Sequence, residues 1–154
     1  MCYLIKEENG CKEILLAKKK KGFGEGKWNG VGGKIEEKDK DILETAVRET
    51  KEEIGIHIEV PEKVASLSFY FPHKKEWNQN VHVFVAKQWR GELKESEEML
   101  PKWFKHQEIP YHEMWDDDKF WLESVLDGKK IKASFVFGER EKLVEKNVEI
   151  TKEL

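Results

Sequence analysis

The sequence is poor in cysteine, in long apolar runs and in any excess of one charge. Only two cysteines, Cys2 and Cys11, occur among 154 residues, so the chain has neither a disulfide framework nor the Cys-x-x-Cys spacing of a zinc site. The apolar run that opens the chain is too short for a signal-peptide core or a membrane span. These absences predict a cytoplasmic protein that does not enter a membrane.

Charged residues are abundant but balanced. They make up 38% of the chain, with 31 acids against 28 bases and a formal net charge of −3. A protein that coats nucleic acid would be dominated by Lys and Arg, so the balance disfavours nucleic acid as a partner. A hydrophobic content of 38%, with 11% aromatic residues, argues against disorder. We expect a monomer in which residues 1–154 form a single domain with its own core.

Hydrophobic periodicity predicts several strands and two separated helices. Asn9-Gly10 lies between two apolar runs, at 2–6 and 13–17, which is a strong hairpin signal. Further strands are expected at 56–71, 80–89, 131–137 and 142–150, and a second helix at 116–127. This mixture of strands and helices indicates an α+β fold or an α/β/α sandwich.

The first helix is expected to begin at Asp41 and to end at Gly55. Asp41 and Glu44 have the spacing of a capping box, and a glycine commonly ends a helix in the left-handed conformation. The apolar stripe of this helix is predicted at Leu43, Val47, Thr50 and Ile54.

Three acids share another face of that helix. Glu49, Glu52 and Glu53 fall within an arc of roughly 100°, away from the apolar stripe, so we expect the core to leave them unburied. Their mutual repulsion and the helix dipole both oppose this arrangement, and a hard cation such as Mg²⁺ would offset it. The alternative is an ordinary solvated acidic face. A glycine-rich loop ending in Gly32-Gly33 lies just upstream, and its backbone can approach a ligand closely.

These residues resemble a known motif. Gly33, Arg48-Glu49, Glu52-Glu53 and Gly55-Ile56 are similar to the Nudix box, G-x5-E-x7-R-E-U-x-E-E-x-G-U, in which U is apolar. One extra residue lies between Gly33 and Arg48, so the isolated Glu of the box falls on Asp39 or Lys40, and Thr50 replaces an apolar residue. The resemblance implies a Nudix hydrolase, with an α/β/α sandwich built on a mixed β-sheet and two main helices.

Segments outside the box resemble one branch of that family, the animal MutT homologues. They are Lys20–Gly24, Trp28–Gly30, Val81–Phe84, Glu98-Met99, Trp103-Phe104, Ile109-Pro110, Met114-Trp115 and Asp117-Asp118. Enzymes of this branch hydrolyse oxidised purine nucleoside triphosphates such as 8-oxo-dGTP and keep them out of DNA and RNA. The resemblance implies Mg²⁺-dependent hydrolysis, with Mn²⁺ as an alternative, of such a nucleotide to a monophosphate and pyrophosphate.

On this reading, the carboxylates of four glutamates and a backbone carbonyl would hold the metal. These ligands are Glu49, Glu52, Glu53, Glu98 and Gly32. Glu53 is the first choice for the general base and Glu49 the second. Arg48 would orient a ligand glutamate, and Lys19 would meet the phosphates as a point charge.

The purine base would be bound by an amide, by aromatic rings and by paired acids. Asn29 offers both a donor and an acceptor. The candidates for stacking are Phe23, Phe69 and Trp115, with Trp121 as a further one, and plain core packing is the alternative for each. Asp117 and Asp118 would read the base edge, one of them as a neutral acid; the alternative is a favourable interaction with the start of a helix.

Two other functions remain open. A Nudix hydrolase of a dinucleotide, a nucleotide sugar or a capped RNA end is disfavoured by the absence of an extra domain and by Asn29, Asp117 and Asp118. A Nudix-derived module that binds nucleotides without hydrolysis is disfavoured because all three helix glutamates remain. Residues 72–80 are the least family-like part, so Trp77 is a candidate for altering substrate choice.

Overall fold

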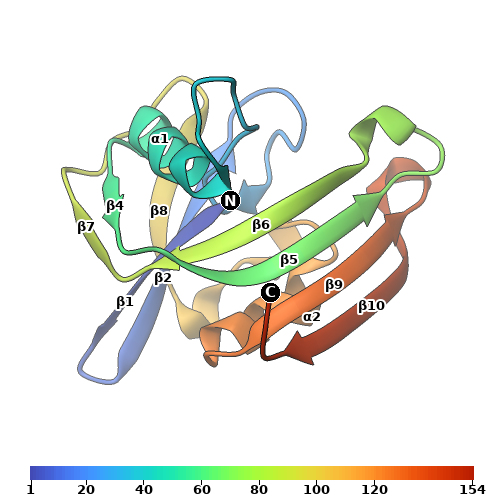
Figure 1. Ribbon diagram of the computed structural model, residues 1–154. Coiled ribbons are helices and arrows are strands. Elements are labelled where there is room, and N and C mark those ends of the chain that lie inside the picture. Colours follow the sequence, from blue (N-terminus) through green and yellow to red (C-terminus); the bar gives the residue numbers. More distant parts are fainter. The chain divides into compact units, whose positions relative to one another are not determined.

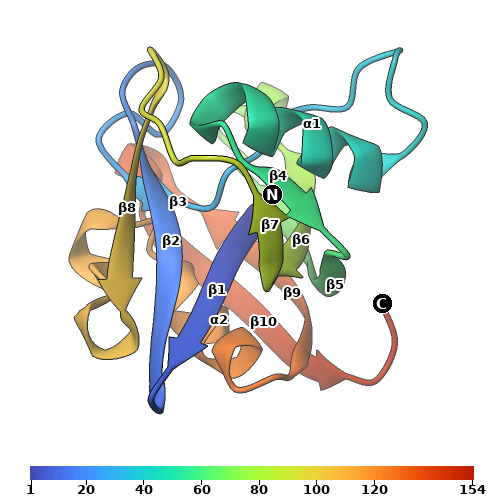
Figure 2. The ribbon, with the colours of Figure 1, turned by 90° about the vertical axis from the view of Figure 1, so that its left-hand side faces the viewer.

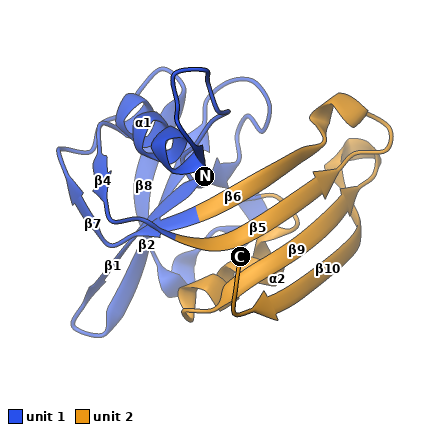
Figure 3. Ribbon diagram, viewed as in Figure 1, with its two compact units in different colours: residues 1–62, 84–114 blue, residues 63–83, 115–154 orange.

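The computed structural model describes residues 1–154 and divides into two compact units (Figure 3). Unit 1 comprises Met1–Glu62 and Phe84–Met114, and unit 2 comprises Lys63–Val83 and Trp115–Leu154. The two units are therefore interleaved along the chain, and strand β6 (Gln79–Ala86) contributes residues to both. Each unit contains one α-helix.

A hairpin opens unit 1, as the sequence predicts. Strands β1 (Cys2–Glu8) and β2 (Cys11–Lys19) pair in antiparallel fashion with Glu8 opposite Cys11. The turn residues Asn9 and Gly10 have φ values of 51° and 76°. Two positive φ angles in a two-residue turn match the right-handed twist of the flanking strands, which is why Asn-Gly is favoured there.

The other strands of unit 1 pair either with this hairpin or with one another (Figure 2). They are β3 (Trp28–Asn29), β4 (His57–Glu59), β7 (Gln88–Arg90) and β8 (Met99–Lys105). Strands β3 and β8 pair with β2, β4 pairs with β7, and the end of β6 runs parallel to β1. The β4–β7 pair is a separate two-stranded sheet, and the other pairs, parallel and antiparallel, belong to a mixed sheet. Strand β8 was not expected from the sequence, because Pro101 and two lysines interrupt its apolar alternation.

Helix α1 (Ile42–Ile54) begins and ends as expected. The side chain of Asp41 accepts a hydrogen bond from the amide of Glu44, and Gly55 follows the helix with a φ of 78°. The capping box itself is shifted, since the carboxylate of Glu44 accepts from the amide of Lys40 rather than from that of Asp41.

The buried face of α1 differs from the predicted stripe. Leu43 is 38% exposed and Val47 is only partly buried. The buried residues are Thr45, Ala46, Thr50, Glu53 and Ile54. Ala46 and Ile54 pack in a core cluster with Cys2, Leu4, Leu15, Ala17, Val31, Ile56, Ile58, Phe84, Ala86 and Met99. Thr50 tolerates full burial because its hydroxyl donates to the carbonyl of Ala46 at 2.7 Å.

Unit 2 combines helix α2 with long strands (Figure 1). Its elements are β5 (Glu62–Tyr70), most of β6, α2 (Asp118–Leu126), β9 (Lys130–Phe137) and β10 (Leu143–Thr151). Strand β9 pairs in parallel with β5 and antiparallel with β10, so the strand pairing within this unit is mixed as well. Neither α1 nor α2 has the length and apolar character that a membrane crossing requires.

Two predicted strands are divided in the structure. The run expected at 56–71 breaks between β4 and β5 because Val60 has a φ of 46° and Pro61 follows it. The run expected at 80–89 separates into β6 and β7. Short 3₁₀ turns occur at Lys75–Trp77, His106–Glu108, Tyr111–Glu113 and Glu139–Glu141.

Candidate active site

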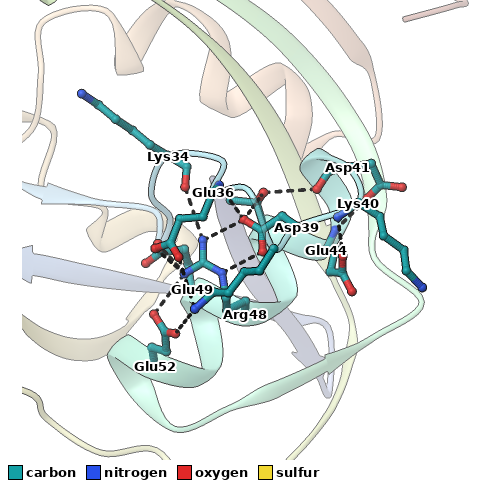
Figure 4. A network of polar contacts seen from close by, with 11 residues as sticks. Lys34, Glu36, Asp39, Lys40, Asp41, Glu44, Arg48, Glu49 and Glu52 are labelled. Atoms are coloured by element: carbon teal, nitrogen blue, oxygen red, sulfur yellow. Dashed lines mark hydrogen bonds and ion pairs between the residues drawn. The ribbon is translucent and has the colours of Figure 1, made fainter.

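The guanidinium group of Arg48 organises the acidic end of α1 (Figure 4). It donates to Asp39 through Nε at 2.8 Å and through Nη2 at 2.9 Å. Its Nη1 contacts Glu49 at 3.0 Å and Glu52 at 3.1 Å, and Glu36 lies 3.4 Å away. One cation therefore holds acids from the helix and from the loop before it in a fixed arrangement.

Asp39 and Lys40 are the two alternatives for the isolated glutamate of the Nudix box, and Asp39 is the one whose side chain contacts Arg48. The side chain of Asp39 is 2% exposed and accepts hydrogen bonds from Arg48, from the amide of Glu36 at 2.9 Å and from the hydroxyl of Thr45 at 3.0 Å. The hydrogen bonds from Arg48 hold the pKa of this carboxyl well below its usual range, and the Glu36 amide adds to the effect. Lys40, by contrast, meets Glu44 through its backbone amide.

Glu49 lies against a glycine that leaves no room for a side chain. A Cβ atom on Gly33 would come within 2.4 Å of the Glu49 carboxyl group, far inside van der Waals contact. Gly32 is similarly enclosed, since a Cβ there would lie 2.8 Å from the Cα of Met1. A side chain at Gly32 would therefore displace the backbone at Met1, whereas one at Gly33 would displace the Glu49 carboxyl group from its position beside the loop.

Glu53 contradicts the expectation that the core leaves the three helix acids unburied. It is 8% exposed, and its Oε2 atom is buried without a hydrogen-bond partner. Burial, and then the charge of Glu49, raise its pKa from 4.5 to about 7, although Lys19 opposes the shift. The buried face of α1 is rotated from the predicted stripe, so Glu53 faces inwards while Glu52 stays half-exposed.

Lys19 and Glu98 reach the same region from other segments. The charges of both affect the pKa of Glu53, Lys19 by lowering it and Glu98 by raising it. The amide of Lys20 donates to the carbonyl of Glu98 at 2.9 Å, which ties the segment before β8 to the end of β2. Unit 1 therefore brings Lys19, Arg48, Glu49, Glu52, Glu53 and Glu98 into one electrostatically coupled region.

These acids do not form a closed metal cage. No group of three or more acidic, histidine or cysteine side chains is arranged tightly enough to enclose an ion by itself. Mg²⁺ usually takes one or two carboxylates and completes its shell with water and substrate phosphates, so an open set of this kind is chemically compatible with it.

Asn29 is already partly engaged by the protein. Its side-chain oxygen accepts from the hydroxyl of Tyr3 at 3.0 Å and from the amide of Gly30 at 2.8 Å. The expected acceptor is thus used internally, and the NH₂ group is the part of the side chain that can serve a ligand. Phe23 is 41% exposed in the turn between Gly22 and Gly24, both of which have positive φ.

Asp117 and Asp118 lie at the start of α2 in unit 2, and each is 2% exposed. The side chain of Asp117 makes no capping bond; its Oδ2 accepts from the indole N–H of Trp121 at 2.9 Å. Burial raises the pKa of Asp117, and that hydrogen bond opposes the rise. Trp121 is fully buried, so its ring has no face for stacking on a ligand.

Aromatic rings surround Phe71 in the same unit. Phe71 stacks on Phe137 at 5.3 Å between ring centroids, and Trp115 meets Phe137 edge-on at 5.6 Å. Phe69 stacks on Phe135 at 5.6 Å and also meets Phe137 at 6.3 Å. Phe69 and Trp115 were predicted from the sequence as candidates for stacking, whereas Phe71 and Phe137 were not. Phe69 and Phe71 share one side of an extended segment by their two-residue spacing, and that signal could have found Phe71.

Comparisons with known proteins agree with this geometry. A family model described as the NUDIX domain matches residues 1–125. The oxidized purine nucleoside triphosphate hydrolase of Mus musculus is 40% identical over 131 residues, 85% of this chain and 83% of that protein. The protein of the same name in Danio rerio is 38% identical over 141 residues, 92% of this chain and 89% of that protein.

Solved structures show the same fold. The MutT protein from Bacillus halodurans matches with a TM-score of 0.80 and 28% identity, covering 96% of this chain and 94% of that one. The NUDIX domain of Shewanella oneidensis NrtR, solved with ADP ribose, matches with a TM-score of 0.69 and 15% identity, covering 82% and 84%. The expected α+β fold with mixed strand pairing and two main helices is confirmed.

Proposed function

The chain belongs to the NUDIX family, and from that premise we propose that it hydrolyses oxidised purine nucleoside triphosphates of the 8-oxo-dGTP type to a nucleoside monophosphate and pyrophosphate. The substrate follows the two curated relatives, which align along most of their length with this chain. Both units contribute residues to the stretch that the NUDIX model matches, so we propose one catalytic domain.

The observation that carries the proposal is the state of Glu53. A carboxylate that is buried beside Glu49, with one oxygen lacking a hydrogen-bond partner, is unfavourable unless a cation neutralises it. The donors near it are hard oxygens, and such ligands suit Mg²⁺ or Mn²⁺. We assign the metal to the carboxylates of Glu49, Glu52, Glu53 and Glu98 and to the carbonyl of Gly32. When bound, the metal supplies charge neutralisation for the phosphates and makes water more acidic.

The side chains of α1 have distinct roles in this proposal. Glu53 is the first candidate for the general base and Glu49 the second. In the metal-free protein, burial and the charge of Glu49 raise the pKa of Glu53 to about 7, and a bound cation would favour its ionised form. Arg48 holds Glu49 and Glu52 in place through hydrogen bonds, and Asp39 holds Arg48. Lys19 provides positive charge for the phosphates.

For recognition of the purine base we propose candidate residues within each unit separately. In unit 1, the NH₂ group of Asn29 donates to the base and Phe23 offers an exposed ring face. In unit 2, Trp115 and Phe69 supply aromatic surface, and Asp117 and Asp118 read the base edge. Burial favours the neutral form of Asp117, which could donate a hydrogen bond to a base carbonyl.

The test is a panel of nucleotides assayed by separation of all the nucleotide products, with and without Mg²⁺; pyrophosphate is expected as the second product of the triphosphates only. The panel contains 8-oxo-dGTP, an oxidised dATP, dGTP, a dinucleotide polyphosphate and a nucleotide sugar. We expect the highest kcat/KM for an oxidised purine triphosphate and no turnover after chelation of the metal. Preference for the dinucleotide or the sugar would refute the substrate, and binding without any turnover would identify a non-catalytic module.

The remaining properties are proposed on the same basis. Both cysteines are free thiols, which fits the reducing cytoplasm. We propose a monomer whose partner is the nucleotide alone, and sedimentation of the purified protein with and without nucleotide would test this state.

A further inference from the structure

The connection between β5 and β6 begins at Phe71, and backbone and side-chain hydrogen bonds join later residues of the connection back to Phe71. The amide of Lys74 donates to the carbonyl of Phe71 at 2.9 Å, and the amide of Trp77 donates to the carbonyl of Lys74 at 2.9 Å. The side-chain oxygen of Asn78 accepts from the amide of Phe71 at 2.6 Å. In Figure 1, this connection lies at the same end of unit 2 as the turn between β9 and β10. These bonds fix residues 71–78 as one ordered segment.

Trp77 packs its ring against Phe71 from within this connection. The ring centroids are 5.6 Å apart with an interplanar angle of 88°, an edge-to-face pair. The ammonium group of Lys74 lies 3.9 Å from the centroid of the Trp77 ring, close enough for a cation–π interaction. Trp77 is therefore held by its own turn.

Phe71 in turn contacts two further aromatic rings of unit 2, those of Phe137 and Trp115. It is 2% exposed, stacks on Phe137 with an interplanar angle of 15° and meets Trp115 edge-on at 6.4 Å. Trp115 precedes Asp117 by two residues. A run of ring contacts thus connects Trp77, on a half-exposed turn, with the segment to which we assign base recognition.

We propose that Trp77 is a positioning residue that fixes Phe71, and through it Trp115, for recognition of the purine base. The inference rests on the proposed function, because it assigns a role at that same site. Without the Trp77 ring, Phe71 gains rotational freedom on one side, and the aromatic surface is no longer preorganised for a base. The carboxylates that perform hydrolysis lie in unit 1, so the loss falls on KM rather than on kcat.

The experiment compares four proteins: the parent, Trp77→Ala, Trp77→Phe and Trp89→Ala. Trp89 is the matched control, since it is also half-buried and also faces another ring, Trp103, at 5.6 Å, but in unit 1. We expect Trp77→Ala to raise KM for 8-oxo-dGTP about five- to ten-fold, as expected for weakened base stacking. Its kcat should stay within about two-fold of the parent value, and Trp77→Phe should recover most of the loss.

Thermal stability separates positioning from folding. Trp89→Ala should lower Tm about as much as Trp77→Ala while leaving KM unchanged. Equal KM values in the two alanine variants, or a fall in kcat alone, would overturn the proposal. If Trp77→Ala does not fold, Trp77→Leu takes its place, because it keeps apolar volume and removes the ring edge.

Failure of the proposed function would be visible separately. A parent protein that hydrolyses no oxidised purine refutes the function but not the role of Trp77. Calorimetric Kd values for 8-oxo-dGMP on the same four proteins then decide that role. A Kd raised in Trp77→Ala and restored in Trp77→Phe supports it, and equal Kd values for Trp77→Ala and Trp89→Ala refute it.

Discussion

Unit 1 holds Asp39 against the guanidinium group of Arg48, whereas unit 2 holds Asp117 beneath the indole N–H of Trp121. The first carboxyl has its pKa depressed by hydrogen bonds from a cation, and the second has its pKa raised by burial. The pKa values of these two aspartates are therefore shifted in opposite directions from the ordinary value. The difference suits unit 1 to cations and phosphates, and unit 2 to a hydrogen-bonding base.

Glu53 breaks this division, because it lies in unit 1 but behaves like an acid of unit 2. Its burial and the neighbouring Glu49 raise its pKa to about 7, and Arg48 contacts Glu49 and Glu52 instead. A bound cation would therefore offset the cost of burying the ionised carboxylate of Glu53.

The largest effect is expected from Glu53→Gln. We expect kcat to fall about 100-fold or more, because the substitution removes both the proposed base and a charge of the metal site while it keeps the shape. Steady-state pyrophosphate release measures this loss. Glu8→Gln, an exposed change at the end of β1, is the matched control and should leave kcat unchanged. Comparable turnover of Glu53→Gln and the parent would remove Glu53 from the active site.

The same variant has a defined pH signature in metal-free buffer. Folding raises the pKa of Glu53 from 4.5 to about 7, so the ionised carboxylate destabilises the protein above that pH, and the penalty vanishes as the pH falls below 4.5. The Tm of Glu53→Gln should exceed that of the parent at pH 8 and match it at pH 4.5. Added Mg²⁺ should raise the Tm of the parent more than that of the variant.

A smaller effect is expected from Asp39→Asn, which weakens the restraint on Arg48. We expect kcat to fall about 10- to 100-fold, the usual range for a residue that orients a ligand. Because folding lowers the pKa of Asp39, its stabilisation is present above the unfolded pKa and is lost at lower pH. The variant should thus melt below the parent at pH 7, and the difference should shrink below about pH 4. Asp41→Asn retains a capping side chain and serves as the control; an equal loss in both variants would contradict the role of Asp39.

Asp117→Asn and Asp118→Asn test the proposed base-recognition residues at the start of α2 in unit 2. Each substitution should raise KM for 8-oxo-dGTP by roughly ten-fold and change the ratio of kcat/KM for 8-oxo-dGTP to that for dGTP. The reason is that an amide in place of the carboxyl group leaves a buried polar group without its hydrogen-bond partner on the base. Hydrolysis by α1 should remain competent, so kcat should change less than KM. Asp127→Asn, an exposed change at the end of α2, is the control. Lower Tm with unchanged selectivity in both variants would show that the two acids only support the fold.

The smallest effect is expected from Lys40→Ala. Only the backbone amide of Lys40 contacts Glu44, so loss of its side chain should leave kcat/KM within about two-fold of the parent value. A severe loss of Mg²⁺-dependent activity at unchanged Tm would show that the longer loop takes part in the site.

Predictions from the sequence were reliable wherever the structure depends only on residues that are close together in the chain. Asn9-Gly10 predicted the hairpin because a two-residue turn requires positive φ at both positions. Asp41 and Gly55 predicted the ends of α1 because each satisfies backbone groups within its own turn. Predictions that depended on distant neighbours were weaker: β8 was missed, and Leu43 was placed in a stripe from which the structure excludes it.

The sequence by itself therefore determined the hairpin, the limits of α1 and the presence of the Nudix box, since spacing along the chain defines all three. Only the tertiary structure decided that Glu53 is buried, that Asp39 rather than Lys40 binds Arg48, and that the oxygen of Asn29 is used by Tyr3. The physical reason is that burial and hydrogen-bond partners depend on segments remote in sequence. A helix of given composition can be rotated to bury a different face, and its neighbours select which face that is.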